Sequence, residues 1–308
     1  MQVAFFGTSE FAVASLEALI SHRHTLQLCV TQPDRPQGRG RRLMPSPVKA
    51  AALRHGLPLQ QPEALRAEDF NAWHPEIGIV IAYGRLIPLD LLAWPTHGMV
   101  GVHPSLLPRY RGAAPIPWAL LNGETTSGVT IFRLTERLDA GEMLLQRSVA
   151  IAPRENAEQL ARRLAQLGAQ ALVEGLEAIA AGRASWSPQD ESRASVAPKL
   201  TKAQGRIDWR QPAAVIERLV RATVPWPAAR CRWQGHELTL WDVSVRETSE
   251  RREETVPGTV LQMEERAVTV ATGDGALDLH EVQPAGRRRM TIGEFLAGHA
   301  MKPGARLE

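Results

Sequence analysis

Two residues far apart in the chain have the types and settings that proton-transfer chemistry requires. His103 ends an apolar run and is followed by a proline, and Asp139 lies in a turn-like segment, Leu-Asp-Ala-Gly-Glu at 138–142. If the two side chains meet, the carboxylate orients the imidazole, and the ring can act as a proton donor or acid. A structural histidine and an ordinary turn aspartate remain the alternative on these residues alone.

Ser105 lies close enough to His103 in the chain to suggest a Ser-His-Asp hydrolase. Leu-Leu-Pro follows at 106–108, however, which predicts a wall rather than a nucleophile on a sharp turn. The G-x-S-x-G, Walker A and H-E-x-x-H patterns are absent, and Gly7 begins a turn without the G-x-G-x-x-G spacing. Hydrolase, P-loop and zincin chemistry are therefore disfavoured, and no metal site is expected.

A cluster of basic residues occupies a short, loop-like segment with one acid, Asp34. Its members are Arg35, Arg39, Arg41, Arg42 and Lys49. The whole chain has 36 Lys and Arg against 33 Asp and Glu, so its formal net charge of +3 is a weak signal. The local cluster can place several cations against phosphates and gain affinity by counterion release. A solvated surface loop is the alternative.

Apolar, strand-like runs alternate with helix-like segments in the first half of the chain. Strands are predicted at 3–6, 26–30, 77–82, 99–102, 129–134 and 143–151, and helices at 11–20, 63–73 and 155–181. Such alternation predicts an open α/β sheet. Because ligands of these sheets bind beyond the carboxyl ends of the strands, His103 stands where a site is expected.

The sequence changes character after the long helix. From 185 to 204 it is polar and rich in Ser, Pro and Lys, as expected of a connecting segment. A helix at 213–222 and short strand-like runs follow, which predict a small barrel or sandwich. We therefore expect a first domain at 1–188, a linker at 189–205 and a second domain at 206–308.

Composition indicates a cytoplasmic protein. The chain has two cysteines, Cys29 and Cys231, too few for a disulfide framework. The N-terminal residues lack a basic leader with a cleavage site, and no stretch approaches the ~18 apolar residues of a membrane span. A monomer is expected, since the sequence carries no interface signal.

Two segments resemble a known family. Residues 103–112, His-Pro-Ser-Leu-Leu-Pro-Arg-Tyr-Arg-Gly, match the H-x-S-L-L-P-x-x-x-G signature of the 10-formyltetrahydrofolate-dependent formyltransferases. Leu-Asp-Ala-Gly at 138–141 matches their second catalytic segment, and further matches such as Ala-Tyr-Gly at 82–84 extend over nearly the whole chain. The chain is therefore identified as a member of this family. The basic segment, 31–49, is similar to the tRNA-contacting loop of those members that act on methionyl-tRNA.

The resemblance implies a fold and a reaction. The fold is α/β, with a Rossmann-like formyltransferase domain that carries the catalytic site, followed by a small OB-fold-like β-barrel domain. The reaction transfers a formyl group from 10-formyltetrahydrofolate to the amino group of methionyl initiator tRNA and supports translation initiation. His103 would stabilise or protonate the developing oxyanion, and Asp139 would hold the imidazole and assist proton transfer.

The resemblance also assigns residues to the two substrates. The folate site would be lined by Ser105, Leu106, Leu107, Pro108, Tyr83, Gly84, Leu86 and Ile87. The tRNA would be bound by Arg35, Arg39, Arg41, Arg42, Lys49, Arg287 and Arg288, with Arg289 beside them.

One position departs from the family pattern, N-x-H-x-S-L-L-P. The asparagine of the pattern donates a hydrogen bond to the developing oxyanion, and this chain has Gly101 there. Loss of one such donor typically lowers turnover by ~10² to 10³. A weakened enzyme, a water or backbone N–H in the vacated space, and a donor from elsewhere are three accounts that the sequence does not separate. Two other functions also stay open, a formyltransferase of an amino sugar and a catalytically silent protein that binds tRNA or folate.

Overall fold

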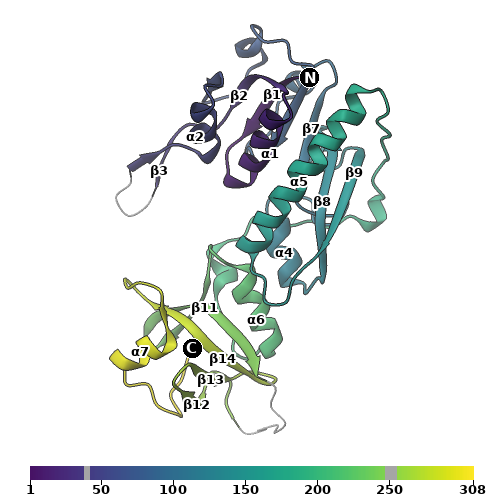
Figure 1. The fold of residues 1–308 in the computed structure, drawn as a ribbon. Coiled ribbons are helices and arrows are strands. Elements are labelled where there is room, and N and C mark those ends of the chain that lie inside the picture. Colours follow the sequence, from purple (N-terminus) through teal and green to yellow (C-terminus); the bar gives the residue numbers. More distant parts are fainter. Residues whose placement is uncertain (38–41, 247–254) are drawn as a thin grey trace. The chain divides into compact units, whose positions relative to one another are not determined.

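The computed structural model describes residues 1–37, 42–246 and 255–308, and the contacts of the chain divide it into two units (Figure 1). The first unit comprises Met1–Pro115, Thr126–Ala150 and Ala161–Ala197. The second comprises Ile116–Thr125, Ile151–Leu160 and Pro198–Glu308. Each unit is therefore built from three separate stretches of chain.

A seven-stranded sheet forms the centre of the first unit. In spatial order its strands are β5 (Leu59–Gln60), β2 (Thr25–Val30), β1 (Gln2–Gly7), β6 (Ile77–Ile81), β7 (Met99–His103), β8 (Thr126–Arg133) and β9 (Met143–Ala150). The pairs from β5 to β7 are parallel, whereas β8 and β9 run antiparallel to their neighbours. Val3 to Phe6 are fully buried, as expected of parallel strands covered on both faces. The predicted α/β class is confirmed.

Helices lie between these strands along the chain and follow the last of them (Figure 1). They are α1 (Glu10–Ser21), α2 (Pro47–Arg54), α3 (Leu89–Leu92), α4 (Pro115–Leu121) and α5 (Ala157–Ala180), with the 3-10 turns η1 (Ala67–Phe70) and η2 (Glu191–Arg193). The helix predicted around 63–73 is wrong, since only η1 forms there. The carbonyls of Pro62 and Glu63 accept hydrogen bonds from Arg85, at 2.9 and 2.7 Å. Phe70 is fully buried against Trp94, with ring centroids 5.5 Å apart, so tertiary contacts override the local helical pattern.

The basic segment is more ordered than the loop-like prediction. Its described residues form an antiparallel ribbon of β3 (Arg35–Gln37) and β4 (Arg42–Met44), in which Arg35 lies opposite Met44. Helix α2 begins after Ser46, whose Oγ accepts a hydrogen bond from the Lys49 N–H at 3.0 Å, and Pro47 stands in its first turn.

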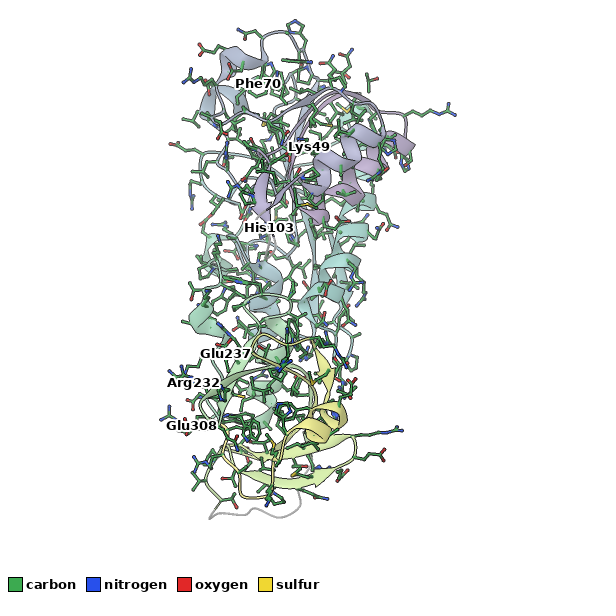
Figure 2. The ribbon with its side chains drawn as sticks, turned by 90° about the vertical axis from the view of Figure 1, so that its left-hand side faces the viewer. Lys49, Phe70, His103, Arg232, Glu237 and Glu308 are labelled. Atoms are coloured by element: carbon green, nitrogen blue, oxygen red, sulfur yellow. The ribbon has the colours of Figure 1, made fainter. Side chains whose placement is uncertain are left out.

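The second unit is an antiparallel β structure, as expected. Its strands are β10 (Ala229–Trp233), β11 (His236–Arg246), β14 (Ala276–Pro284), β13 (Ala267–Ala271) and β12 (Val260–Glu264) in spatial order, with β15 (Met290–Thr291) paired to β14. The helical elements of its last stretch are η3 (Lys202–Gly205), α6 (Ala213–Ala222) and α7 (Ile292–Gly298), and all but the first residue of α4 belongs to this unit as well. The end of the chain is tied to β10, because Arg232 and Glu308 exchange main-chain hydrogen bonds of 2.7 and 2.8 Å (Figure 2).

Two short stretches that come before residue 161 belong to the second unit. The Glu155 carbonyl accepts a hydrogen bond from Arg221 at 3.0 Å, and Arg154 pairs with Asp242 at 2.7 Å. A side chain at residue 123 would strike Arg218, since a Cβ on Gly123 would lie 2.5 Å from its guanidinium. These contacts make 116–125 and 151–160 part of that unit's packing.

The domain boundaries expected at 188 and 206 stay a prediction. The segment expected to link the domains nevertheless makes specific contacts within the first unit. Arg111 donates its N–H to the Ser195 carbonyl at 2.8 Å, and its carbonyl accepts from the Ala197 N–H at 2.7 Å. Among the helices of the described residues, none has the length and apolar character that crossing a membrane requires.

Candidate active site

Loops that follow several strands meet at the carboxyl edge of the first sheet, where α/β proteins bind ligands. Thr8 follows β1, Gln32 follows β2 and Tyr83 follows β6. The Tyr83 carbonyl accepts hydrogen bonds from Thr8 Oγ1 at 2.9 Å and from Gln32 Nε2 at 2.6 Å. His103 is the last residue of the next strand, β7, so it stands at the same edge (Figure 2).

Both ring nitrogens of His103 face protein groups. Nε2 donates to the Tyr110 carbonyl at 2.8 Å, and Nδ1 lies 3.6 Å from Asp139 Oδ2. Because a carbonyl only accepts, Nε2 carries a hydrogen and Nδ1 is the nitrogen left to take up or release a proton. His103 is 6% exposed, so this nitrogen lies in surroundings largely shielded from water.

Asp139 is held in a strained turn. Its φ of 51° lies in the left-handed region, which costs a non-glycine residue of order 1 kcal/mol. Its Oδ2 accepts a hydrogen bond from the Gly112 N–H at 2.8 Å. The turn also packs closely against the end of β8, because a Cβ on Gly141 would lie 1.8 Å from the Arg133 carbonyl oxygen. The structure thus brings the predicted pair together, and the catalytic role of the two residues stays a prediction.

Ser105 has a different set of partners from a catalytic serine. Its Oγ donates to the Arg109 carbonyl at 2.6 Å, and its own carbonyl accepts from Thr130 Oγ1 at 2.7 Å. Thr130 Oγ1 in turn accepts from the Leu107 N–H at 3.1 Å. These hydrogen bonds fix the conformation of the loop after β7. Ser105, which is 2% exposed, therefore has a structural role in that loop. The Ser-His-Asp hydrolase alternative gains no support.

The other residues predicted at the folate site fall into two groups. Tyr83, Leu107 and Pro108 are buried, and burial raises the pKa of the Tyr83 hydroxyl. Tyr83 packs edge-on to Phe6, with ring centroids 5.8 Å apart. Leu106 and Ile87 are half-buried, and Gly84 and Leu86 are exposed, Leu86 by 78%. The buried residues pack beneath the loops that follow the strands, whereas the Leu86 side chain is exposed to solvent.

Gly101 lies in the middle of β7, between Val80 of β6 and Phe132 of β8. A Cβ at this position would lie 2.7 Å from Phe132 Cε1 and 3.0 Å from Leu134 Cδ1. The Phe132 ring also meets the His103 imidazole edge-on, with centroids 6.3 Å apart. An aromatic ring therefore packs closely over the position where the family pattern has asparagine. Sequence reasoning missed Phe132, because only the β7–β8 register reveals the contact.

The predicted tRNA-binding residues lie in both units. Arg35 is exposed on β3, Arg42 is in β4, and Arg39 and Arg41 lie outside the described residues. Lys49 is paired with Asp34 at 2.7 Å, and that hydrogen bond holds the pKa of the Asp34 carboxyl below its usual value.

In the second unit the arginines of the predicted cluster are exposed. Arg288 pairs with Glu294 at 2.6 Å, and Arg289 pairs with Glu281. The exposed Arg287 stands directly before them. Across the part of the chain that the structure describes, no three His, Cys, Asp or Glu residues gather as metal ligands would.

Comparison with known proteins defines the class and then the family. The formyl transferase model matches residues 1–176, and the model of the formyl transferase C-terminal domain matches residues 199–300. The methionyl-tRNA formyltransferase of Geobacter metallireducens is 41% identical over 311 residues, covering 100% of this chain and 98% of the relative. That of Chloroflexus aurantiacus is 46% identical over 303 residues, covering 97% of each. The chain therefore belongs to the methionyl-tRNA formyltransferase family.

A solved structure shows the same fold. HypX from Aquifex aeolicus, in complex with tetrahydrofolic acid, superposes with a TM-score of 0.68 at 22% sequence identity. The match covers 97% of this chain and 48% of that protein.

Proposed function

We propose that this protein transfers the formyl group of 10-formyltetrahydrofolate to the amino group of methionyl initiator tRNA and so supports translation initiation in the cytosol. The observation that carries the proposal is the buried approach of His103 Nδ1 to Asp139 Oδ2, at 3.6 Å, beyond a strand end. Relatives that are 41% and 46% identical over nearly the whole chain are methionyl-tRNA formyltransferases.

The reaction removes a proton from the methionyl amine and returns one to the leaving nitrogen, so the site must relay a proton. The folate co-substrate supplies the formyl group. His103 Nδ1 and Asp139 Oδ2 face each other and would hold that proton between removal and return. The Tyr110 carbonyl fixes the ring through Nε2 and keeps Nδ1 aimed at the carboxylate.

The residues near the strand ends fit a folate. Exposed aliphatic side chains are surfaces against which the faces of a flat ring system such as a pterin can pack. Leu86, Leu89 and Leu138 are 78%, 59% and 61% exposed, and Leu138 directly precedes Asp139. The buried Tyr83 and Leu107 would back this surface and keep it in place.

The acceptor side rests on the basic ribbon. Arg35 and Arg42 stand on its two strands, and phosphates of a tRNA acceptor arm would neutralise such cations. The exposed Arg287 and Arg288 would add phosphate contacts from the second unit.

Formyl transfer to purified methionyl initiator tRNA, with 10-formyltetrahydrofolate as donor, tests the proposal. We expect product from the wild-type protein, and rates at least ~10²-fold lower from His103→Asn and Asp139→Asn, because each removes a partner of the proton relay. His74→Asn, a change of an exposed histidine of the same unit, is the matched control and should leave the rate unchanged. Transfer to an amino sugar but not to the tRNA would instead identify a sugar formyltransferase.

A catalytically silent tRNA- or folate-binding protein is the second candidate. The packing of Phe132 over Gly101 favours it, because a side-chain donor at position 101 would have to displace the ring. Tight binding of both substrates by the wild-type protein, without any product, would support this second candidate.

A further inference from the structure

We propose that Gln189 is a positioning residue for Asp139, and that Arg111 orients the Gln189 amide for this task. The inference rests on the proposed function, because it concerns how the same site is held. Gln189 lies between the regions that the two family models match, which end at 176 and begin at 199. It also lies in the segment that the sequence predicts to be a linker.

The Gln189 amide bridges the turn that carries Asp139. Its Nε2 donates two hydrogen bonds of 2.8 Å, one to the Asp139 carbonyl and one to the Gly141 carbonyl. Its Oε1 accepts from Arg111 Nε at 3.0 Å and from a terminal guanidinium nitrogen at 2.7 Å. Both amide hydrogens and the amide oxygen are thus engaged in a residue that is 9% exposed.

The partners leave only one orientation for the amide. A guanidinium has no acceptor and a carbonyl has no donor, so a flipped amide would lose all four bonds. Arg111 is itself 9% exposed and is held on its far side by Glu191, at 2.9 Å. Arg137 also pairs with Glu191, at 3.0 Å. This chain of contacts fixes the amide before any substrate arrives.

The same segment holds the other half of the pair. Ser195 Oγ accepts from the Tyr110 N–H at 2.9 Å, and the Tyr110 carbonyl is the acceptor for His103 Nε2. Asp139 adopts a left-handed backbone that it would not favour on its own. Without Gln189, the buried Gly141 carbonyl and the half-buried Asp139 carbonyl lose this donor, and the turn can relax and carry Oδ2 away from His103.

Steady-state formylation by Gln189→Met and Gln189→Glu tests the proposal. The glutamate keeps an acceptor for Arg111, and with it the ion-pair chain, but loses both donors to the turn. We expect kcat to fall about tenfold or more in both variants, with each KM within about twofold, because the substrates still bind to an imprecise site. When Asp139 is already replaced by asparagine, the same Gln189 changes should lower kcat by less than about twofold relative to Asp139→Asn alone, since Gln189 acts through Asp139. Equal losses in both backgrounds, or wild-type kcat in both variants, would overturn the proposal.

Ser187→Ala is the matched control in the same segment. The Ser187 hydroxyl donates to the Met143 carbonyl on β9 at 3.3 Å, and alanine keeps the main-chain hydrogen bonds between the two residues, so the kcat of this variant should stay at the wild-type value. Amide hydrogen exchange supplies a readout that needs no activity. The Gly112 N–H donates its hydrogen bond to Asp139 Oδ2. Its hydrogen should exchange at least about tenfold faster in the Gln189 variants than in the wild-type protein, and at the wild-type rate in Ser187→Ala. Unchanged Gly112 exchange would overturn the positioning role, whereas faster exchange in a protein that never formylates would contradict only the proposed function.

Discussion

At the residue scale, Gly101 and Phe132 form a matched pair. A glycine in a strand interior often marks the close approach of another group, and here that group is an aromatic ring. Of the three accounts of the missing donor, a water in the vacated space is the hardest to reconcile with this packing. The Phe132 ring also meets the His103 imidazole edge-on, so the pair packs against both the position of the family asparagine and the histidine proposed to act in proton transfer.

Gly101→Asn alone should destabilise the protein by about 1–3 kcal/mol, because its side chain overpacks against Phe132 and Leu134. The double variant Gly101→Asn, Phe132→Leu should recover part of that loss and should turn over faster than the wild-type protein, since the new amide can then reach the oxyanion. Urea unfolding and kcat measure the two effects, with Phe132→Leu as the control. If the Gly101→Asn variant is as stable as the wild-type protein, the Phe132 ring moves aside without cost, which would contradict the expected overpacking.

At the scale of elements, the basic ribbon is anchored at its base. Asp34 Oδ2 accepts from Lys49 at 2.7 Å, and Asp34 Oδ1 accepts from Gln61 at 2.8 Å. The hydrogen bond to Lys49 lowers the pKa of Asp34, so this contact is fully present above the usual pKa of aspartate and is lost only as the pH falls through the lowered one. Lys49 therefore holds the ribbon, whereas Arg35 is exposed on β3.

Substitutions should separate these two roles. Arg35→Gln should weaken tRNA binding and lower the slope of log affinity against log salt by about 1, as loss of one phosphate contact does. Lys49→Gln should weaken binding with a smaller change of slope, because Asp34 already neutralises its charge. Titrations at several salt concentrations measure both slopes, and Asp34→Asn, Lys49→Gln keeps the local charge as a control. Equal slope changes for Arg35→Gln and Lys49→Gln would place Lys49 on a phosphate.

The strands and long helices were predictable because apolar periodicity records burial. Val3 to Phe6 and α5 show this, as does the placement of His103 at a strand end. The prediction of a helix at 63–73 was wrong because the carbonyls of Pro62 and Glu63 accept hydrogen bonds from Arg85, which is distant in sequence. The contacts of Phe132 and Gln189 were out of reach because register and turn geometry, which no local pattern encodes, bring them to the site. The meeting of His103 and Asp139 was predictable only as one of two alternatives.

At the scale of the whole molecule, each unit buries one cysteine. Cys29 lies in β2 of the first unit and Cys231 in β10 of the second, 0% and 4% exposed. Burial raises the pKa of each thiol to about 12. A neutral buried thiol favours the folded state, so its contribution is intact below the ordinary thiol pKa of 9.0 and is lost as the pH rises towards about 12.

Alkylation by iodoacetamide at pH 8 should therefore report the opening of each unit separately. Both thiols should react far more slowly than a free thiol in the native protein, and each should react at the rate at which its own unit opens in urea. Mass spectrometry of the two cysteine peptides gives the two rates, and a fully denatured sample gives the reference. Rapid native alkylation of either peptide would contradict its burial.

The threading of the chain has a consequence for exchanging parts between relatives. Because the chain passes between the units at 115/116, 125/126, 150/151, 160/161 and 197/198, a gene fragment encoding 198–308 omits two pieces of the second unit. Arg218 would lose the backbone at Gly123, and Arg221 would lose the Glu155 carbonyl. A chimera that swaps only the last stretch would join mismatched surfaces, whereas one that also carries 116–125 and 151–160 from the same parent keeps them matched. Recombination at a single junction is therefore a poor route by which this architecture could acquire a new C-terminal domain.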